Sequence, residues 1–236
     1  MASIHWPVPL ETHLCEAADD INPVLARAFQ AMRLTANVQE QSSADPQTST
    51  PAQSTFYASH DQLLERVQLP EFQTLVGFIA NSLQKTVMNA NAGIWPAGRM
   101  KLQLQIVGCW FQIQNGMMFH DIHTHGNCSW SGVYYVQCDR EEQRRSHPQL
   151  GDINGMTRFY GPYSQWQGGA HMDAGNAYLQ KNTLDVSPEP GRLVVFPSYL
   201  PHKAMPYEGE TDRIIVSFNA QIHAAGGDQL FKYDAT

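Results

Sequence analysis

The sequence is short of basic residues, and this shortage excludes one class of partner. Its 236 residues contain 15 lysines and arginines against 22 aspartates and glutamates, which gives a formal charge of -7. Binding to nucleic acid needs a clustered basic surface, so we expect no nucleic acid as a main partner. The basic cluster at residues 140–145 is interrupted by two glutamates and predicts a solvated loop.

Cysteine pairs and long apolar runs are also missing. The cysteines at positions 15, 109, 128 and 138 form no C-x-x-C pair, so neither a zinc ribbon nor a thioredoxin-like site is indicated and free thiols are expected. No apolar run reaches the roughly 18 residues that a membrane-spanning helix needs. Residues 1–10 lack the basic start of a signal peptide. We therefore expect a cytoplasmic protein without a membrane partner.

The chain length predicts a single domain of the larger β-rich kind. Pro7 and Pro9 restrict residues 1–14 to an edge strand or an extended arm. Residues 37–57 are polar and contain two prolines, which predicts a flexible loop within the domain. The expected parts are an N-terminal arm and helix (1–36), this loop (37–57), a helical region (58–90), a β core (100–220) and a C-terminal tail (221–236).

Three helices are expected before the β core. Asn22 is the expected N-cap of the first, with Pro23 as its first helical residue. Ser59 and Gln62 predict a capping box for a short second helix. After Pro70 the apolar residues recur at helical spacing, which predicts an amphipathic helix packed on the core. This stripe comprises Phe72, Leu75, Val76, Ile79 and Leu83.

From Lys101 onward the pattern changes from helical to alternating. The segments K-L-Q-L-Q-I-V and W-F-Q-I-Q alternate apolar and polar residues, which is typical of half-buried strands. Helices first and strands after predict a mainly β or α+β fold whose helices pack on a sheet or barrel. No glycine-rich phosphate loop is present, which excludes a Rossmann or P-loop domain. Further strands are expected near 132–138, 155–160, 192–197 and 212–220, with loops at 139–152 and 161–190.

Metal-binding residue types gather in the stretch His120–His125. On a regular strand, residues two apart point to the same face. The alternation therefore places Asp121, His123 and His125 on one face and His120 on the other. Two imidazoles side by side on a strand supply two of the three ligands of a facial non-haem iron site.

A second stretch, Gly191–Asn219, contains residues that could complete such a site. His202 ends a proline-marked turn and is the candidate third ligand. On the following strand, Arg213 and Ser217 share one face. A buried arginine stays charged and pairs with a carboxylate through two hydrogen bonds, so Arg213 is expected to hold an anionic cosubstrate, with Ser217 beside it.

Four motifs in order resemble the Fe(II)/2-oxoglutarate-dependent oxygenases, over roughly residues 100–220. The resemblance implies a double-stranded β-helix, the jelly-roll or cupin-like form of barrel, with the N-terminal helices packed against it. The motifs are His123-Thr124-His125 (H-x-H), Ser131–Tyr135 (S-G-x-Y-Y), Phe196–His202 (F-P-S-x-x-x-H) and Arg213–Asn219 (R-I-x-x-S-F-N).

The resemblance implies Fe(II) and 2-oxoglutarate as cofactors, with O2 and a small-molecule or peptidyl substrate that is hydroxylated as succinate and CO2 are released. It makes His123, His125 and His202 the metal ligands. Arg213 would hold the far carboxylate of 2-oxoglutarate, helped by Ser217.

This chain departs from most such oxygenases at one ligand. They present H-x-D/E, whereas His125 stands here in the place of the carboxylate. Asp121 remains an alternative third ligand, or a partner that orients a ligand imidazole.

Two other functions stay open on the sequence. A cupin-like three-histidine metalloenzyme that does not use 2-oxoglutarate would accommodate H-x-H, but it would leave Arg213 without a task. A non-catalytic barrel would bind a ligand or a partner, with a structural metal or none. Which aromatic residues line the pocket is open, and so is the oligomeric state, with a homodimer as one option. Segments 37–57, 139–152 and 161–190 are candidate lids.

Overall fold

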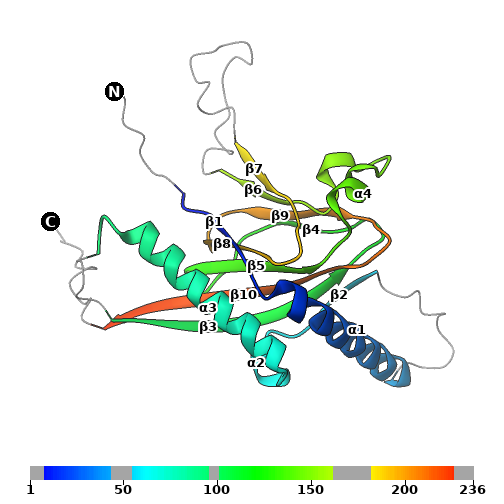
Figure 1. Cartoon of the computed structure of the whole chain (residues 1–236), viewed down its shortest axis with the longest axis horizontal. Coiled ribbons are helices and arrows are strands. Elements are labelled where there is room, and N and C mark those ends of the chain that lie inside the picture. Colours follow the sequence, from blue (N-terminus) through cyan, green and yellow to red (C-terminus); the bar gives the residue numbers. More distant parts are fainter. Residues whose placement is uncertain (1–7, 44–54, 96–100, 162–181, 226–236) are drawn as a thin grey trace, which may run out of the picture.

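Two antiparallel sheets and a layer of helices make up the part of the chain that the structure describes (Figure 1). The computed structural model describes residues 8–43, 55–95, 101–161 and 182–225. The helices are α1 (Ala18–Ser43), α2 (Leu63–Arg66), α3 (Pro70–Asn91) and α4 (Glu141–Arg145), with a 3-10 turn at Gly151–Ile153. The strands are β1 (Glu11–Leu14), β2 (Phe56–Ala58), β3 (Lys101–Gln114), β4 (Met118–His123), β5 (Trp130–Gln137), β6 (Thr157–Tyr160), β7 (Thr183–Val186), β8 (Arg192–Pro197), β9 (His202–Tyr207) and β10 (Arg213–Ala225).

The chain passes back and forth between the two sheets. The six-stranded sheet has the order β1-β8-β5-β10-β3-β2, and the four-stranded sheet has the order β4-β9-β6-β7. From β3 to β9, each strand of the larger sheet is followed by one or two strands of the smaller one, and β10 then returns to the larger sheet. This alternation closes a flattened barrel, and the expected double-stranded β-helix with N-terminal helices is confirmed.

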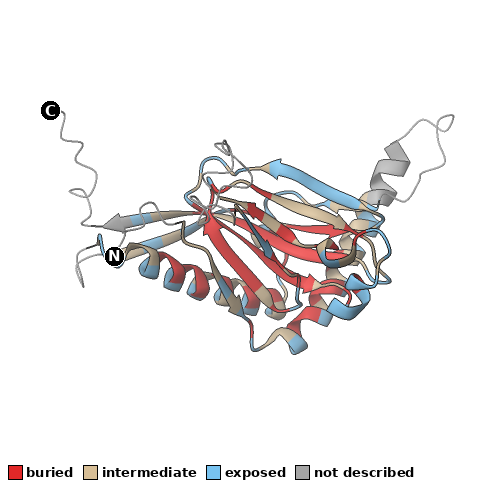
Figure 2. Ribbon diagram, turned by 90° about the horizontal axis from the view of Figure 1, so that it is seen from above, coloured by how far each residue is buried: buried red, intermediate tan, exposed pale blue. Residues whose placement is uncertain are grey.

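Strand alternation gives the larger sheet two different faces. On β5, Tyr134 and Val136 belong to the core beneath the helices, whereas Val133 and Tyr135 belong to the core inside the barrel. The same strands therefore support the helical layer on one face and the barrel interior on the other. Figure 2 shows the buried residues concentrated in these central strands and in the helix faces that cover them.

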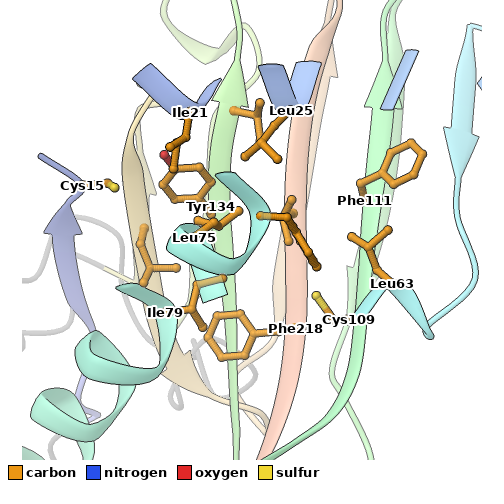
Figure 3. Close-up of a cluster of buried hydrophobic side chains, with 14 of the residues drawn as sticks. Cys15, Ile21, Leu25, Leu63, Leu75, Ile79, Cys109, Phe111, Tyr134 and Phe218 are labelled. Atoms are coloured by element: carbon orange, nitrogen blue, oxygen red, sulfur yellow. The ribbon is translucent and has the colours of Figure 1, made fainter. Parts of the chain in front are cut away.

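The core beneath the helices is closely packed (Figure 3). Phe29 of α1 stacks on Phe111 of β3 with ring centroids 4.4 Å apart. The predicted stripe of α3 faces this core, with Leu75 and Ile79 fully buried. A fully buried side chain of this size contributes about 1.5–3 kcal/mol, so α3 is held by packing.

Helix α1 differs from the prediction at both ends. It begins at Ala18, four residues before the expected cap, and Pro23 lies inside it. Asn22 caps nothing because its Oδ1 accepts a hydrogen bond of 2.8 Å from the buried Tyr134 hydroxyl. The helix continues to Ser43 and β2 covers 56–58, so the predicted loop at 37–57 is wrong over these residues. Residues 44–54 lie outside the described part of the chain.

The predicted capping box of α2 is also wrong. The helix has Gln62 as its N-cap without a side-chain hydrogen bond. Ser59 Oγ instead accepts a hydrogen bond of 3.0 Å from the backbone N–H of Phe111, because this segment runs beside β3.

Two expected loops and the expected tail contain regular structure. Residues 139–152 include α4, and Arg144 is buried rather than solvated because it donates to the carbonyls of Asp139, Asn154 and Pro188. Residues 161–190 include β7, with 162–181 outside the described residues. Strand β10 extends to Ala225, into the predicted tail.

Three further expectations can be compared with the structure. Strand β1 lies at the edge of the larger sheet, as predicted for residues 1–14, of which 1–7 are not described. All four cysteines are free thiols. Within the described ranges, no helix combines the length and apolar character needed to cross a membrane.

Candidate active site

Three histidines from two strands and a loop meet at one end of the barrel interior. His123, His125 and His202 each bring a ring nitrogen into a group whose atoms lie within 4.8 Å of one another. His123 ends β4 and pairs with His202, which begins β9. His125 follows β4 by two residues, and its backbone N–H donates to Ser198 O at 3.0 Å.

Hydrogen bonds to backbone carbonyls orient two of the rings. Nδ1 of His123 lies 2.6 Å from Asp121 O, and Nδ1 of His202 lies 3.0 Å from Leu200 O. A carbonyl oxygen can only accept, so Nδ1 carries the proton and Nε2 keeps its lone pair. Nε2 of His125 lies 3.3 Å from Nε2 of His202. Nitrogens at adjacent positions of a metal with bonds of about 2.1 Å lie about 3 Å apart, close to this value.

Burial keeps the imidazoles of His125 and His202 neutral. Desolvation lowers the pKa of His202 to about 3, with the hydrogen bond to Leu200 O opposing the shift. Desolvation, aided by the charges of His123 and His120, lowers the pKa of His125 to about 4. Neutral imidazole is the form that binds metal, so these two side chains are ready to bind near neutral pH.

Asp121 points away from the histidine group. Its side chain is 78% exposed and lies 3.5 Å from Lys203 Nζ. A hydrogen bond from Ile122 N–H, and then Lys203, lower the pKa of this carboxyl. Asp121 does orient His123, but through its backbone carbonyl. The structure therefore brings His125, not Asp121, beside His123 and His202.

His120 lies on the face that the sequence pattern did not predict. Its ring stacks on that of His123 with centroids 4.0 Å apart, and both rings line one cavity. The pairing of β4 with β9 shifts register on both sides of His120, so the two-residue alternation fails. The prediction that Asp121 shares a face with His123, and His120 does not, is therefore wrong.

Arg213 lines the same cavity from β10. It is 1% exposed, and Ile215 and Ser217 line the cavity beside it, as the alternation on β10 predicted. Its Nη1 donates to Gln114 Oε1 at 3.1 Å and its Nη2 to Thr157 Oγ1 at 3.5 Å. Its Nε has no partner, and no acidic side chain of the described residues forms an ion pair with it.

The cavity is open to solvent. The three histidines and the buried Arg213, whose Nε has no hydrogen-bond partner among the described residues, line this cavity together. A buried charge normally has a counter-ion, so Arg213 is suited to an anionic ligand that enters here.

A sequence model of the family described as "Putative 2OG-Fe(II) oxygenase" matches residues 108–219, which include all five predicted site residues. The match coincides with the barrel that carries the histidines and Arg213. Over these residues, which are just under half of the chain, the sequence is similar to the 2-oxoglutarate- and Fe(II)-dependent oxygenases. A search of curated protein sequences finds no match.

Solved structures share the fold of this chain at low sequence identity. HygX from Streptomyces hygroscopicus with nickel and 2-oxoglutarate bound has a TM-score of 0.53 and 9% identity, over 91% of this chain and 83% of that one. HygX with iron bound has a TM-score of 0.51 and 9% identity, over 91% of this chain and 82% of that one. A Pseudomonas putida prolyl-4-hydroxylase has a TM-score of 0.49 and 14% identity, over 91% of this chain and 93% of that one. The two HygX likenesses support the barrel fold.

Fe(II) and 2-oxoglutarate are the cofactors of this oxygenase family, and the cavity residues fit both. Imidazole nitrogen is a suitable ligand for iron, and three such donors leave positions open on the opposite side of the metal. Arg213 offers the cosubstrate a buried cation with an unpaired Nε.

Sequence reasoning missed several residues of the oxygenase cavity. Gln112 and Thr157 line it, yet both stand in strand patterns that carry no motif. Among the aromatic candidates, Trp110 lines the cavity, whereas Trp130 and Tyr134 pack beneath the helices. The alternation along β3 was the signal that could have identified Gln112 and Trp110 as neighbours on one face.

Proposed function

We propose that this oxygenase hydroxylates a C–H bond of a small-molecule or peptidyl substrate, with 2-oxoglutarate converted to succinate and CO2. One observation carries the proposal: the buried Arg213 has no counter-ion among the described residues and lies in the wall of the cavity that holds the histidine group. A three-histidine enzyme that does not use 2-oxoglutarate would have no need of this cation.

The residues then have distinct roles. His123, His125 and His202 hold Fe(II). Hydrogen bonds to backbone carbonyls fix the rings of His123 and His202. Arg213 and Ser217 hold the far carboxylate of 2-oxoglutarate. Bound Fe(II), with 2-oxoglutarate and O2, supplies the oxidising chemistry.

The protein also controls access to the site. His120 is exposed and lines the cavity, so it lies where the cavity meets solvent. His202, Phe159 and Phe196 are buried together behind it, with the ring of Phe196 4.7 Å from that of His202. Water is therefore excluded from one side of the metal group, and substrate enters from the side of His120.

The test is to add Fe(II) and then 2-oxoglutarate without oxygen and to record the visible charge-transfer band of a chelated 2-oxo acid. Succinate release is then followed under air. Arg213→Ala should weaken the band at a given 2-oxoglutarate concentration. The matched control is Arg158→Ala, whose guanidinium pairs with Asp185 through two hydrogen bonds of 2.7 Å and does not line the cavity.

Two results would contradict the proposal. One is a wild-type protein that shows no band and releases no succinate. The other is an Arg213→Ala protein whose band responds to 2-oxoglutarate as the wild type does.

A further inference from the structure

Gln114 holds Arg213 from outside the cavity. The two residues pair across β3 and β10, and Gln114 is 1% exposed. Its Oε1 accepts a hydrogen bond of 3.1 Å from Arg213 Nη1. Arg213 is among the residues that line the cavity and Gln114 is not. Gln114 therefore contacts the guanidinium and not the space that a ligand would fill.

Two backbone carbonyls fix the orientation of the Gln114 amide. Its Nε2 donates to Met118 O and, at 3.4 Å, to Met205 O. Carbonyls only accept, so Nε2 must face them and Oε1 must face Arg213. Met118 begins β4 and Met205 lies on β9, so the amide ties the arginine to both strands that carry the histidines.

Among the described residues, the groups that contact the Arg213 guanidinium are neutral. The amide of Gln114 and the hydroxyl of Thr157 accept from it, and the ring of Tyr135 lies 5.3 Å from Cζ. Thr157 is itself held by the Tyr135 hydroxyl at 2.6 Å. A glutamate at 114 would have the same shape and would give the buried guanidinium a counter-ion. The chain has the uncharged isostere, so the positive charge is left for a ligand.

We propose that Gln114 is a positioning residue that orients Arg213 without neutralising it, and that it thereby sets the preference for 2-oxo acids with a second carboxylate. The inference rests on the proposed function. Gln114 acts through Arg213 and contributes nothing to the chelating end of the cosubstrate.

The experiment compares two 2-oxo acids on the Fe(II)-loaded, oxygen-free protein by titrating the visible band. 2-Oxoglutarate has a far carboxylate and pyruvate has none. In Gln114→Glu, we expect affinity for 2-oxoglutarate to fall about tenfold or more, since its carboxylate meets a neutralised arginine, with affinity for pyruvate unchanged. The preference for 2-oxoglutarate over pyruvate should fall by the same factor.

Two further variants separate charge from structure. Gln114→Glu loses the two hydrogen bonds that Nε2 donates and keeps the acceptor for Arg213, whereas Gln114→Met loses all three hydrogen bonds and adds no charge. Gln114→Met should therefore weaken the binding of 2-oxoglutarate less than Gln114→Glu does. Gln137→Glu makes the same amide-to-carboxylate change at a residue that donates to Asp212 O at 3.0 Å and, among the described residues, forms no hydrogen bond with Arg213. It should bind both acids as the wild type does.

The outcomes are distinct. If Gln114→Glu weakened the binding of 2-oxoglutarate and of pyruvate equally, the role of Gln114 would be structural and the inference would be overturned. The same conclusion would follow if Gln114→Glu and Gln114→Met lost equal affinity for 2-oxoglutarate. Unchanged 2-oxoglutarate affinity in Gln114→Glu would also overturn the inference. A wild-type protein without a band for either acid would overturn the proposed function, and the inference with it.

Discussion

At the residue scale, the proposed metal site is unusual in charge. Its three grouped side chains are all imidazoles, with His125 in the place where the H-x-D/E pattern would have a carboxylate. Fe(II) with the 2-oxoglutarate dianion then sums to zero charge, where a carboxylate ligand would bring the sum to minus one. Arg213 is the nearby fixed charge in the cavity wall, so the electrostatics of cosubstrate binding depend heavily on it.

We expect His125→Ala to lower the affinity for metal strongly and Asp121→Ala to leave it nearly unchanged. An outer partner of a ligand is typically worth about 10–100-fold in affinity, so loss of His125 as a ligand should cost at least about 100-fold. Asp121→Ala should leave the affinity nearly unchanged, because the carboxylate points to Lys203 and the backbone carbonyl that holds His123 remains. Titration with Co(II), followed by its visible spectrum, measures both. Tight binding by His125→Ala would point to another third ligand.

The metal-free protein should become less stable as the pH is lowered through a defined range. Burial lowers the pKa of His202 to about 3 and that of His125 to about 4, against about 6.5 in an unfolded chain. Between these values the unfolded chain binds protons that the folded chain excludes, so the free energy of unfolding decreases as pH falls from about 6.5 toward 4. Each such proton contributes a slope of up to about 1.4 kcal/mol per pH unit.

Urea unfolding of metal-free protein between pH 7 and 4.5 measures this slope. His202→Asn removes one of the two protons and should flatten the curve, whereas the same change at the exposed His223 should not. A slope that is the same in wild type and His202→Asn would contradict the assignment.

At the element scale, strand alternation succeeded on β10, whose pairing with β3 keeps its register from Arg213 to Asn219. The alternation placed Arg213, Ile215 and Ser217 on one face, and all three line the cavity. On β4 it failed because two register shifts flank His120, and no residue in the sequence marks them. The grouping of His123, His125 and His202 was therefore predictable from the motifs, but the direction of each side chain on an irregular strand was not.

Helix existence was predictable and helix ends were not. The stripe of α3 was visible because each of its buried residues repeats at helical spacing. Asn22 looked like a cap because its residue type suits one, but its amide oxygen accepts from Tyr134, 112 residues away. Ser59 was misread for the same reason, since its partner lies on β3. Such distant partners leave no local signal.

The packing of α1 on the larger sheet gives a prediction for stability. Phe29 is fully buried and stacks on Phe111, so Phe29→Ala should lower the free energy of unfolding by about 3–5 kcal/mol. Phe119 is 48% exposed on β4, and Phe119→Ala should cost well under half of that. Urea unfolding of the two variants makes the comparison. Equal costs would mean that the helical layer adds little to the stability of the barrel.

At the scale of the whole molecule, one sheet serves two cores. Residues of β5, β8 and β10 alternate between the core beneath the helices and the barrel interior. The larger sheet, which carries Arg213 on β10, therefore packs against α1 and α3 on its other face (Figures 1 and 3). A cofactor that bridges this wall and the smaller sheet should stabilise the entire fold.

Thermal unfolding tests that expectation. A ligand present at 100 times its dissociation constant adds about 2.7 kcal/mol to the free energy of unfolding. Ni(II) with 2-oxoglutarate should therefore raise the melting temperature by several degrees, and 2-oxoglutarate without metal should raise it less. In His202→Ala the Ni(II)-dependent shift should vanish. A shift of wild-type size in that variant would place the metal elsewhere.

The edge position of β4 has a consequence for how long a metal ion stays bound. All but the last residue of β4 are exposed, and the strand has β9 as its one neighbour in the described sheet. Such a strand opens locally at far less free energy than the central β10. We therefore expect fast deuterium exchange at β4 amides and slow exchange at β10. Chelators should then withdraw the metal by local opening while Arg213 stays in place, so the protein can be emptied and reloaded without unfolding.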